Sequence, residues 1–198
     1  MREALGISAD GRRVVGYDAR GAAFVWDEPG GLRNLFPGDN FASRGNAISA
    51  DGTTIVGFHR SEGRIRGFRW VDGIGARDLD GGVGNINTTD VSAVSGDGST
   101  VVGSMQDEAL NPVEAFVWTE GGGLQSLRVL LTVLGVDLTG WRLMRATGIS
   151  YDGTTIAGTG WNPAGQMEAW IAVIPEPSPA LLMLLGFAGL GCRRNLSR

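Results

Sequence analysis

One pattern of apolar and polar positions recurs four times along the chain. Each copy begins with an apolar residue and serine, reaches Asp-Gly two positions later, and ends with two polar residues, two apolar residues and glycine. The copies occupy residues 7–16, 48–57, 94–103 and 149–158. Because their internal spacing is identical, the sequence predicts one structural unit repeated four times.

The Asp-Gly pair of each copy lies between two apolar runs, which is a strong signal for a β-hairpin. A two-residue type I′ turn needs positive φ at both central residues, so we expect that turn at each pair. The four predicted hairpin tips are Asp10-Gly11, Asp51-Gly52, Asp97-Gly98 and Asp152-Gly153. The glycine that ends each copy indicates a turn or a closely approaching strand, where a Cβ would be unwelcome.

An aromatic strand follows each copy, at residues 23–26, 67–70, 115–118 and 169–172. In the first of them Phe24 and Trp26 share one face and Val25 takes the other. Apolar residues on both faces are typical of strands buried between stacked sheets, so Trp118 of the third strand is predicted to lie in the core. A glycine-rich turn and leucines close the first three units, which gives about four short strands per unit. These leucines are Leu32 and Leu35, then Leu79, then Leu124 and Leu127.

The first aromatic residue recurs after 44, 48 and 54 residues, close to the roughly 40–50 residues of a propeller blade. The sequence therefore predicts an all-β, β-propeller-like array of about four-stranded repeats over residues 1–173. The longest spacing contains Leu127, Leu130, Leu131 and Leu134 at helical intervals before Gly135. This spacing predicts one short helical insertion that packs its leucine stripe onto the domain.

The repeated unit, Ile-Ser-x-Asp-Gly followed by Val-Gly and by Ala-Phe-x-Trp, resembles the HAF repeat of extracellular bacterial proteins. The resemblance covers roughly residues 4–173 and includes the segment 135–150, which is similar to the last repeat of such proteins. It implies an extracellular repeat protein and brings no catalytic residue with it.

Residues 174–198 form a tail of three parts: Pro175-Glu176-Pro177, an apolar run at 180–191, and Arg193-Arg194. Prolines end regular structure, so the first part predicts an extended linker. The apolar run predicts a C-terminal transmembrane-type helix of roughly 18 Å, short against a hydrocarbon core of about 30 Å. The arginines after it would keep the C-terminus cytoplasmic and act as the membrane stop. A terminal core helix is the alternative, which the lack of a polar face disfavours.

This tail resembles the PEP-CTERM sorting signal. The resemblance implies recognition of Pro175, Glu176 and Pro177 by an exosortase-type processing enzyme in bacteria that also make extracellular polysaccharide. It further implies transient anchoring in the inner membrane and a final location at the cell surface or outside the cell. Because the first repeat begins without a preceding signal-peptide pattern, we expect an N-terminally incomplete chain.

Charge and residue inventory exclude several functions. The chain has a net charge of −4, and the body up to Val173 holds 14 basic and 20 acidic residues, so nucleic acid is not an expected partner. With Cys192 and His59 as the single cysteine and histidine, the chain forms no internal disulfide, no Cys/His zinc site and no His-paired nucleophile. We predict no catalytic residues, no cofactor and no metal site.

Two functional classes remain for the repeats. The favoured one is a non-enzymatic surface or matrix protein that binds or organises extracellular polysaccharide; the alternative is a carbohydrate-active enzyme, a glycosidase or lyase, on the same scaffold. Glycoside hydrolysis needs two carboxylates; Glu108, Glu114 or Glu168 could pair with an aspartate, but nothing singles out any such pair. Calcium at residues 78–82 is a weaker alternative, and His59 is expected to be a solvated loop residue.

Overall fold

The computed structural model describes residues 2–38, 42–61, 64–79, 88–107, 109 and 111–174. Within these residues the chain forms fifteen strands and one helix, and the strands pair into four antiparallel sheets. Sheet 1 contains β1 (Glu3–Ile7), β2 (Arg13–Tyr17), β3 (Ala23–Asp27) and β4 (Gly31–Asn34). Sheet 2 contains β5 (Ser43–Ile48), β6 (Thr54–Ser61), β7 (Arg64–Val71) and β8 (Gly75–Asp78). Sheet 3 contains β9 (Thr88–Val94), β10 (Thr100–Gln106), β11 (Pro112–Thr119) and β12 (Gly123–Ser126), and sheet 4 contains β13 (Arg142–Ile149), β14 (Thr155–Trp161) and β15 (Met167–Val173).

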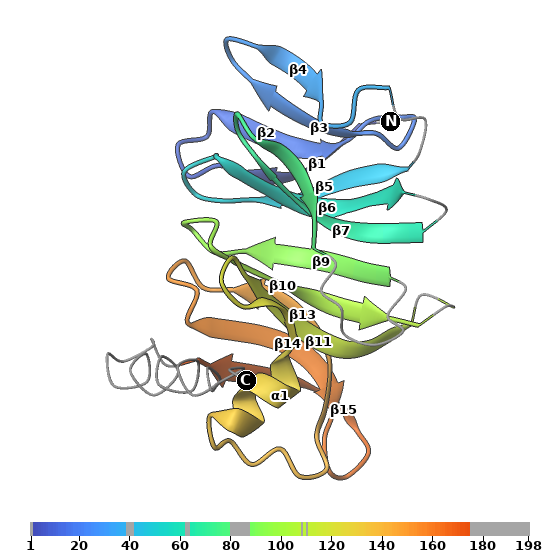
Figure 1. The fold of residues 1–198 in the computed structure, drawn as a ribbon, viewed down its shortest axis with the longest axis vertical. Coiled ribbons are helices and arrows are strands. Elements are labelled where there is room, and N and C mark those ends of the chain that lie inside the picture. The colour runs from blue at the N-terminus through green and yellow to red at the C-terminus, as the bar shows by residue number, and fades with distance from the viewer. Residues whose placement is uncertain are drawn as a thin grey trace, which may run out of the picture.

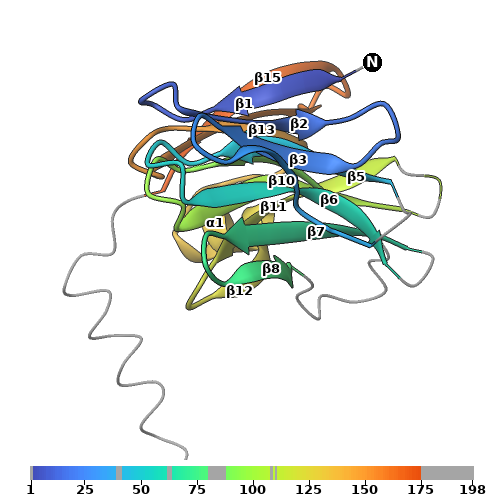
Figure 2. The ribbon, with the colours of Figure 1, turned by 90° about the horizontal axis from the view of Figure 1, so that it is seen from above.

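The sheets follow one another along the long axis of the molecule in chain order (Figure 1). Each sheet is a meander in which sequential strands pair, and the first strand of a sheet packs against the preceding sheet: β5 against β1–β3, β9 against β5–β7, and β13 against β9–β11. Seen from above, the sheets overlap as layers of a stack (Figure 2). The predicted all-β array of repeated sheets is confirmed, and within the described residues it does not close into a ring.

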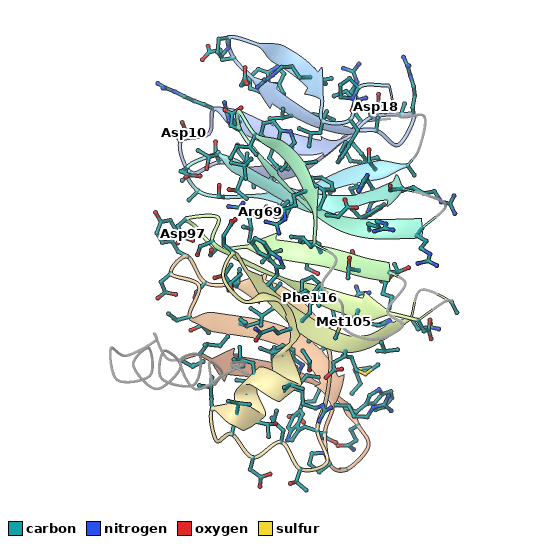
Figure 3. The ribbon with its side chains drawn as sticks, viewed as in Figure 1. Asp10, Asp18, Arg69, Asp97, Met105 and Phe116 are labelled. Carbon is teal, nitrogen blue, oxygen red and sulfur yellow. The ribbon has the colours of Figure 1, made fainter. Side chains whose placement is uncertain are left out.

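The four Asp-Gly pairs lie in the loops that join the first and second strands of each sheet, and Figure 3 places Asp10 and Asp97 along the same edge of the array. The prediction of a two-residue type I′ turn at these pairs is wrong. Ser8 pairs with Arg13 across a four-residue loop, and the Gly11 N–H donates to the Ser8 carbonyl at 2.9 Å. Gly11 takes the positive φ, 72°, as in a type I turn followed by a left-handed residue.

The recurring polar residues of the repeat hold this wider loop together through side chains. In the third copy the Ser95 hydroxyl donates to Asp97 Oδ1 at 2.6 Å, and the Ser99 N–H donates to the same oxygen at 3.0 Å. The Thr100 N–H donates in turn to Ser95 Oγ. The same three bonds form in the other copies. Serine and aspartate are therefore loop-closing residues.

These bonds shift the acid–base behaviour of the loop aspartates. The hydrogen bond from Ser95 and that from the Ser99 N–H hold the pKa of Asp97 below its ordinary value. A carboxylate whose pKa is lowered in the folded state stabilises the fold above its unfolded pKa, about 3.9, and the contribution disappears as pH falls through the folded value.

We therefore expect the Asp97→Asn variant to be less stable than the wild type at pH 7 and to approach it at pH 3. Asparagine still accepts the two hydrogen bonds but carries no charge to strengthen them. Urea unfolding of both proteins at the two pH values measures the difference. A stability difference that is the same at pH 7 and pH 3 would contradict this role of the charge.

The same loops also join neighbouring sheets through a ladder of backbone hydrogen bonds. The N–H of Ala9 donates to Ala50 O at 2.9 Å, that of Ala50 to Gly96 O at 2.9 Å, and that of Gly96 to Tyr151 O at 2.8 Å. All four residues occupy the position between serine and aspartate in the repeat. The sequence does not point to this ladder because the position varies from copy to copy and its contacts use only the backbone.

The glycine that ends each copy lies where another strand comes too close for a side chain. A Cβ on Gly16, Gly57, Gly103 or Gly158 would lie 1.8–2.1 Å from a carbonyl oxygen of the first strand of its sheet. A bulge in the first strand accompanies this approach; in sheet 3, β9 skips one residue between the partners of Val102 and Gly103. The predicted close strand approach is confirmed.

The core forms between consecutive sheets, and alternate residues of the aromatic strand face the preceding and the following sheet. Phe116 and Trp118 of β11 pack with Val56 of sheet 2, while Val117 of the same strand packs with Trp170 of sheet 4. Figure 3 shows Phe116 and Met105 in the interior of the array. Trp118 is 5% exposed, which confirms its predicted place in the core.

The helical insertion is α1 (Leu127–Val133), which packs against β11, β12 and β13. Leu127 and Leu131 are buried, and Gly135 follows the helix with a φ of 84°, so the predicted helix and its leucine stripe are confirmed. The predicted four strands per unit are confirmed in the first three units, and sheet 4 has three strands in the part of the chain that the structure describes. The predicted helix at 180–191 lies outside the described residues.

Candidate functional site

A groove of about 440 Å³ opens at the C-terminal end of the array, between β11, α1 and the start of β13. Its walls combine charged, aromatic and aliphatic side chains. They are Val113, Glu114, Arg128, Leu138, Gly140, Trp141, Arg142 and Leu143. Mixed linings of this kind are typical of sites that bind polar ligands with apolar faces.

One wall of the groove is built on the start of α1. Ser126, the N-cap of the helix, accepts a hydrogen bond from the Val129 N–H at 3.2 Å and donates its hydroxyl hydrogen to Glu114 Oε1. Arg128 Nε lies 3.3 Å from the same carboxylate oxygen. The N-cap residue Ser126 thus holds the Glu114 side chain in place through its hydroxyl. The half-exposed Arg128 compensates the negative charge of Glu114.

The opposite wall is the connection from α1 to β13, which is short and internally bonded. Asp137 Oδ1 accepts from the Thr139 N–H at 2.9 Å and from the Thr139 hydroxyl at 2.7 Å. The Trp141 N–H donates to Leu138 O at 3.0 Å, and Gly140 has a φ of 77°. These bonds place a half-buried Trp141 and an exposed Arg142 side by side at the groove.

A second hollow, of about 210 Å³, also borders Trp141 and is lined by apolar residues. Its lining includes Leu131 of α1, Trp170 of β15 and residues 171–173. Trp141, Leu138 and Leu143 line both hollows. The indole therefore borders both the charged groove and an apolar hollow.

The electrostatics of the charged groove differ from those of the molecule. Two arginines and one glutamate line it, whereas the body of the chain is acidic. Arg128 is engaged with Glu114, so Arg142 is the cation that the groove presents to a ligand. An arginine beside an indole face can bind a carboxylate or hydroxyl oxygens while the ring packs on an apolar surface.

The prediction that His59 is a solvated loop residue is wrong. His59 lies in β6 with its side chain 12% exposed, and its Nε2 lies 2.6 Å from Asp78 Oδ1. The ring stacks on Phe36, with centroids 4.7 Å apart, and Arg66 lies 3.7 Å from the other oxygen of Asp78. Pairing of β6, β7 and β8 creates this cluster, so the local sequence around His59 carries no signal of it.

The other residues that the sequence suggests as candidates are dispersed. Glu168 accepts a hydrogen bond from Asn162 Nδ2 at 2.8 Å, away from the groove. Glu108 and most of the segment 78–82 lie outside the described residues, as do Pro175, Glu176, Pro177, Arg193 and Arg194. Among the residues that the structure describes, no group of three or more His, Cys, Asp or Glu side chains could hold a metal ion. Over the same residues, no helix has both the length and the apolar character that crossing a membrane requires.

The sequence indicates the groove only in part. It singles out Glu114 as a candidate carboxylate and Trp141 as part of the last-repeat segment, but it does not indicate which residues lie beside either of them. Arg128 and Arg142 carry no motif, and they line the same groove because α1 packs on β11 and on β13. An insertion that interrupts the repeat and holds a tryptophan flanked by arginine, Trp141-Arg142, is the signal that could have found the site.

Comparison with known proteins identifies the fold alone. No protein-family model and no curated protein matches the chain. The crystal structure of TolB from Acinetobacter baumannii is similar over 88% of this chain and 41% of that one, with a TM-score of 0.57 and 17% identity. The structure of a TolB homologue from Agrobacterium tumefaciens is similar over 89% of this chain and 62% of that one, with a TM-score of 0.58 and 18% identity. The chain thus spans about two fifths and three fifths of these two proteins, and it shares with them an array of antiparallel sheets.

Proposed function

We propose that this protein is an exported, non-enzymatic surface or matrix protein that binds acidic extracellular polysaccharide through the groove at Trp141. The groove carries the proposal: it places an indole beside the exposed cation Arg142 and the oriented carboxylate of Glu114. The array itself is proposed to be part of a β-propeller, in keeping with the HAF-like repeat period and the sheet order.

Saccharide recognition needs two kinds of contact at once. The C–H face of a sugar ring is apolar and packs on an aromatic ring, while its hydroxyl and carboxylate groups need hydrogen-bond partners. Trp141 supplies the first contact, and Arg142 and Glu114 supply the second. A uronic acid fits best, because its carboxylate can accept two parallel hydrogen bonds from one guanidinium.

Binding rather than catalysis is supported by the number of carboxylates at the groove. Among the described residues that line it, Glu114 is the only one, and it is already engaged by Ser126 and Arg128. The glycosidase mechanism uses two carboxylates roughly 5–10 Å apart. The alternative, a carbohydrate-active enzyme, would need its second carboxylate elsewhere in the chain.

The tail supports the proposed location. Its three parts resemble the PEP-CTERM signal, so we propose that an exosortase-type enzyme recognises Pro175-Glu176-Pro177 while the apolar run at 180–191 and Arg193-Arg194 hold the chain in the inner membrane. Sorting would then release the repeats to the cell surface or matrix, where polysaccharide is the available ligand.

The binding proposal predicts that Trp141→Ala and Arg142→Ala each weaken binding to a polyuronate by about tenfold or more, which corresponds to about 1.4 kcal/mol. Affinity electrophoresis in gels that contain alginate, a polymer of uronic acids, measures this directly. The wild type should be retarded by alginate and much less by dextran, which has no carboxylate for Arg142 to bind.

Trp26→Ala is the matched control, since Trp26 is also partly exposed but lies in sheet 1 at the other end of the array. It should be retarded like the wild type. Equal retardation of all three variants would refute the groove as the binding site, and detection of shortened alginate chains would favour the enzyme alternative.

The sorting proposal predicts that changing Pro175, Glu176 and Pro177 together to alanine traps the protein in the inner membrane. The test needs a host with an exosortase-type enzyme and a signal peptide joined to the chain. Membrane insertion depends on the apolar run and on Arg193-Arg194 rather than on the prolines, so only processing should fail. Appearance of the triple variant outside the cell with the same shortened mass as wild type would mean that the tail is merely an anchor.

A further inference from the structure

The dipeptide Asp-Gly occurs six times along the chain, and the structure describes five of these pairs. Four are the pairs of the repeat loops, and the fifth is Asp72-Gly73 in the turn between β7 and β8. Asp-Gly is chemically reactive because the glycine nitrogen, unhindered by a side chain, can approach the aspartate carboxyl and close a succinimide ring. The five pairs share one dipeptide, so differences in their reactivity come mainly from the structure around them.

Two features of the folded chain decide whether the ring can close. The glycine N–H must be free of an acceptor, because a nitrogen that donates to a carbonyl does not readily lose its proton. The aspartate carboxyl must also be free to turn towards that nitrogen, which it cannot do while hydrogen bonds fix its orientation. The repeat loops and the turn between β7 and β8 differ in both features.

The repeat loops restrain both groups. In the third copy the Gly98 N–H donates to Ser95 O at 3.0 Å. Asp97 Oδ1 accepts from the Ser95 hydroxyl at 2.6 Å, and from the N–H and the hydroxyl of Ser99 at 3.0 and 2.8 Å. These bonds also hold the pKa of Asp97 below its ordinary value, which keeps the carboxyl in the ionised form that loses an oxygen least easily. The glycine bond recurs in the other copies at 2.9–3.0 Å, as do the bonds from the serine hydroxyl and from the backbone.

The turn between β7 and β8 restrains neither group in this way. Its three residues are exposed, and it closes through a bond from the Ile74 N–H to Val71 O at 3.0 Å. Among the hydrogen bonds of the described residues none uses the Gly73 N–H, and a Cβ at Gly73 would meet no atom within 4 Å. The Asp72 carboxylate receives no bond from its own turn. Its contact is Arg13 Nη2 of sheet 1, 2.6 Å from Oδ2, and the aspartate side chain is 38% exposed.

We propose that Asp72-Gly73 is a site of spontaneous isoaspartate formation, and that hydrogen bonds within the repeat loops protect the other four pairs. The Gly73 nitrogen attacks Cγ of the protonated Asp72 carboxyl; the N–Cγ bond forms, a Cγ–O bond breaks, and the departing hydroxyl takes the amide proton and leaves as water. Water then adds to one of the two ring carbonyls. Addition at the main-chain carbonyl breaks its bond to nitrogen and leaves the chain joined through Cγ, which is isoaspartate. The reaction needs no co-reactant besides water.

The modification would change a contact between sheets 1 and 2 without unfolding them. Isoaspartate adds a carbon atom to the main chain and displaces the carboxylate that pairs with Arg13. An exposed ion pair contributes little to stability, and Arg13 keeps its bond to Gly52 O at 2.9 Å. Modified protein should therefore remain folded and accumulate with age.

The test follows oxygen from water into each Asp-Gly pair. Full-length protein is incubated at neutral pH in water enriched in ¹⁸O, in a nonionic detergent that shields the apolar run at 180–191, and is then digested with trypsin in ordinary water. Each hydrolysis of a succinimide places one solvent oxygen in the chain. Trypsin releases three of the pairs singly, in residues 70–77, 3–12 and 45–60, and fragment spectra locate the label. Peptide 70–77 should gain label about tenfold or more faster than the other two, because their pairs must first break bonds to a charged carboxylate.

Two variants and an unfolded sample serve as controls. Asp72→Glu keeps the charge but would have to close a larger ring, so its peptide 70–77 should stay unlabelled. Ser8→Ala removes a hydrogen bond to Asp10 and should raise the labelling of peptide 3–12, while unchanged labelling of 45–60 shows that sheet 2 remains folded. In urea, where no loop restrains any pair, the three wild-type peptides should be labelled at similar rates.

Equal labelling of 70–77 and the two repeat peptides in the folded protein would overturn the proposal. A preference for 70–77 that persists in urea would do the same, because the local sequence rather than the fold would then determine it. Labelling of Asp72→Glu at the wild-type rate would show that the oxygen enters without a succinimide. Unchanged labelling of 3–12 in Ser8→Ala would show that the serine hydrogen bond does not protect the repeat loops.

Discussion

Replacing Gly103 by alanine is expected to destabilise the protein by about 3 kcal/mol or more, which places it among the severe single substitutions. The added Cβ would lie 2.1 Å from Asp90 O and 2.8 Å from Cε1 of Phe116. The first obstacle is backbone of the neighbouring strand, and the second is a ring buried in the core. Neither can move without separating β9 from β10 or sheet 3 from sheet 2.

Gly121→Ala is the control for this prediction. Gly121 lies in the turn between β11 and β12, a Cβ added there would meet no atom within 4 Å, and its φ is not positive. Alanine there should leave stability unchanged or raise it by about 0.4–1 kcal/mol through the unfolded chain. Chemical denaturation of both variants gives the comparison, and equal effects would show that β9 and β10 tolerate a side chain between them.

Replacing Trp118 by alanine is expected to cost about 3–5 kcal/mol, and Trp141→Ala clearly less. Trp118 belongs to the core between sheets 2 and 3, and the Arg69 guanidinium lies 5.5 Å from the centre of its ring. Removing it leaves a cavity bounded by rigid sheets, which collapse poorly. Trp141 is half-buried in the connection after α1, so water can occupy much of the space it leaves.

The two tryptophan variants also separate folding from binding. Thermal and urea unfolding should rank Trp118→Ala as the less stable protein, whereas alginate retardation at 25 °C should rank Trp141→Ala as the weaker binder. Similar stabilities for the two would contradict the division between repeat core and groove.

The repeat makes much of the fold predictable from sequence, because its residues serve local needs. Asp-Gly marks a loop, the paired apolar residues mark a buried strand, and the final glycine marks a close approach, each within ten residues. The predicted turn type is wrong because Ser95 and Asp97 close a wider loop through side-chain hydrogen bonds, which the dipeptide alone does not reveal. The loops set the pairing register of adjacent strands, so the order of strands within each sheet can be predicted from the sequence.

The contacts between repeats are less predictable, since they depend on how one sheet lies on the next. The Ala9–Ala50–Gly96–Tyr151 ladder involves residues of no common type, and the pairing of His59 with Asp78 spans two strand connections. The groove has the same origin: Arg128, Glu114 and Trp141 come from three elements that the insertion brings together. Sequence patterns therefore predict the repeat unit well, but they predict poorly the surfaces that form where one sheet packs on the next.

The most direct test of the proposed function is the ¹H–¹⁵N spectrum of the six tryptophan indoles during titration with oligomers of a uronic acid. Each indole N–H gives one signal, so the signals that shift on titration show where on the array the ligand binds. We predict that the Trp141 signal shifts in a saturable way, that Trp26 and Trp70 do not respond, and that Arg142→Ala suppresses the shift. Absence of any shift at Trp141 while other indoles respond, or no response at all at millimolar oligosaccharide, would contradict binding at the groove.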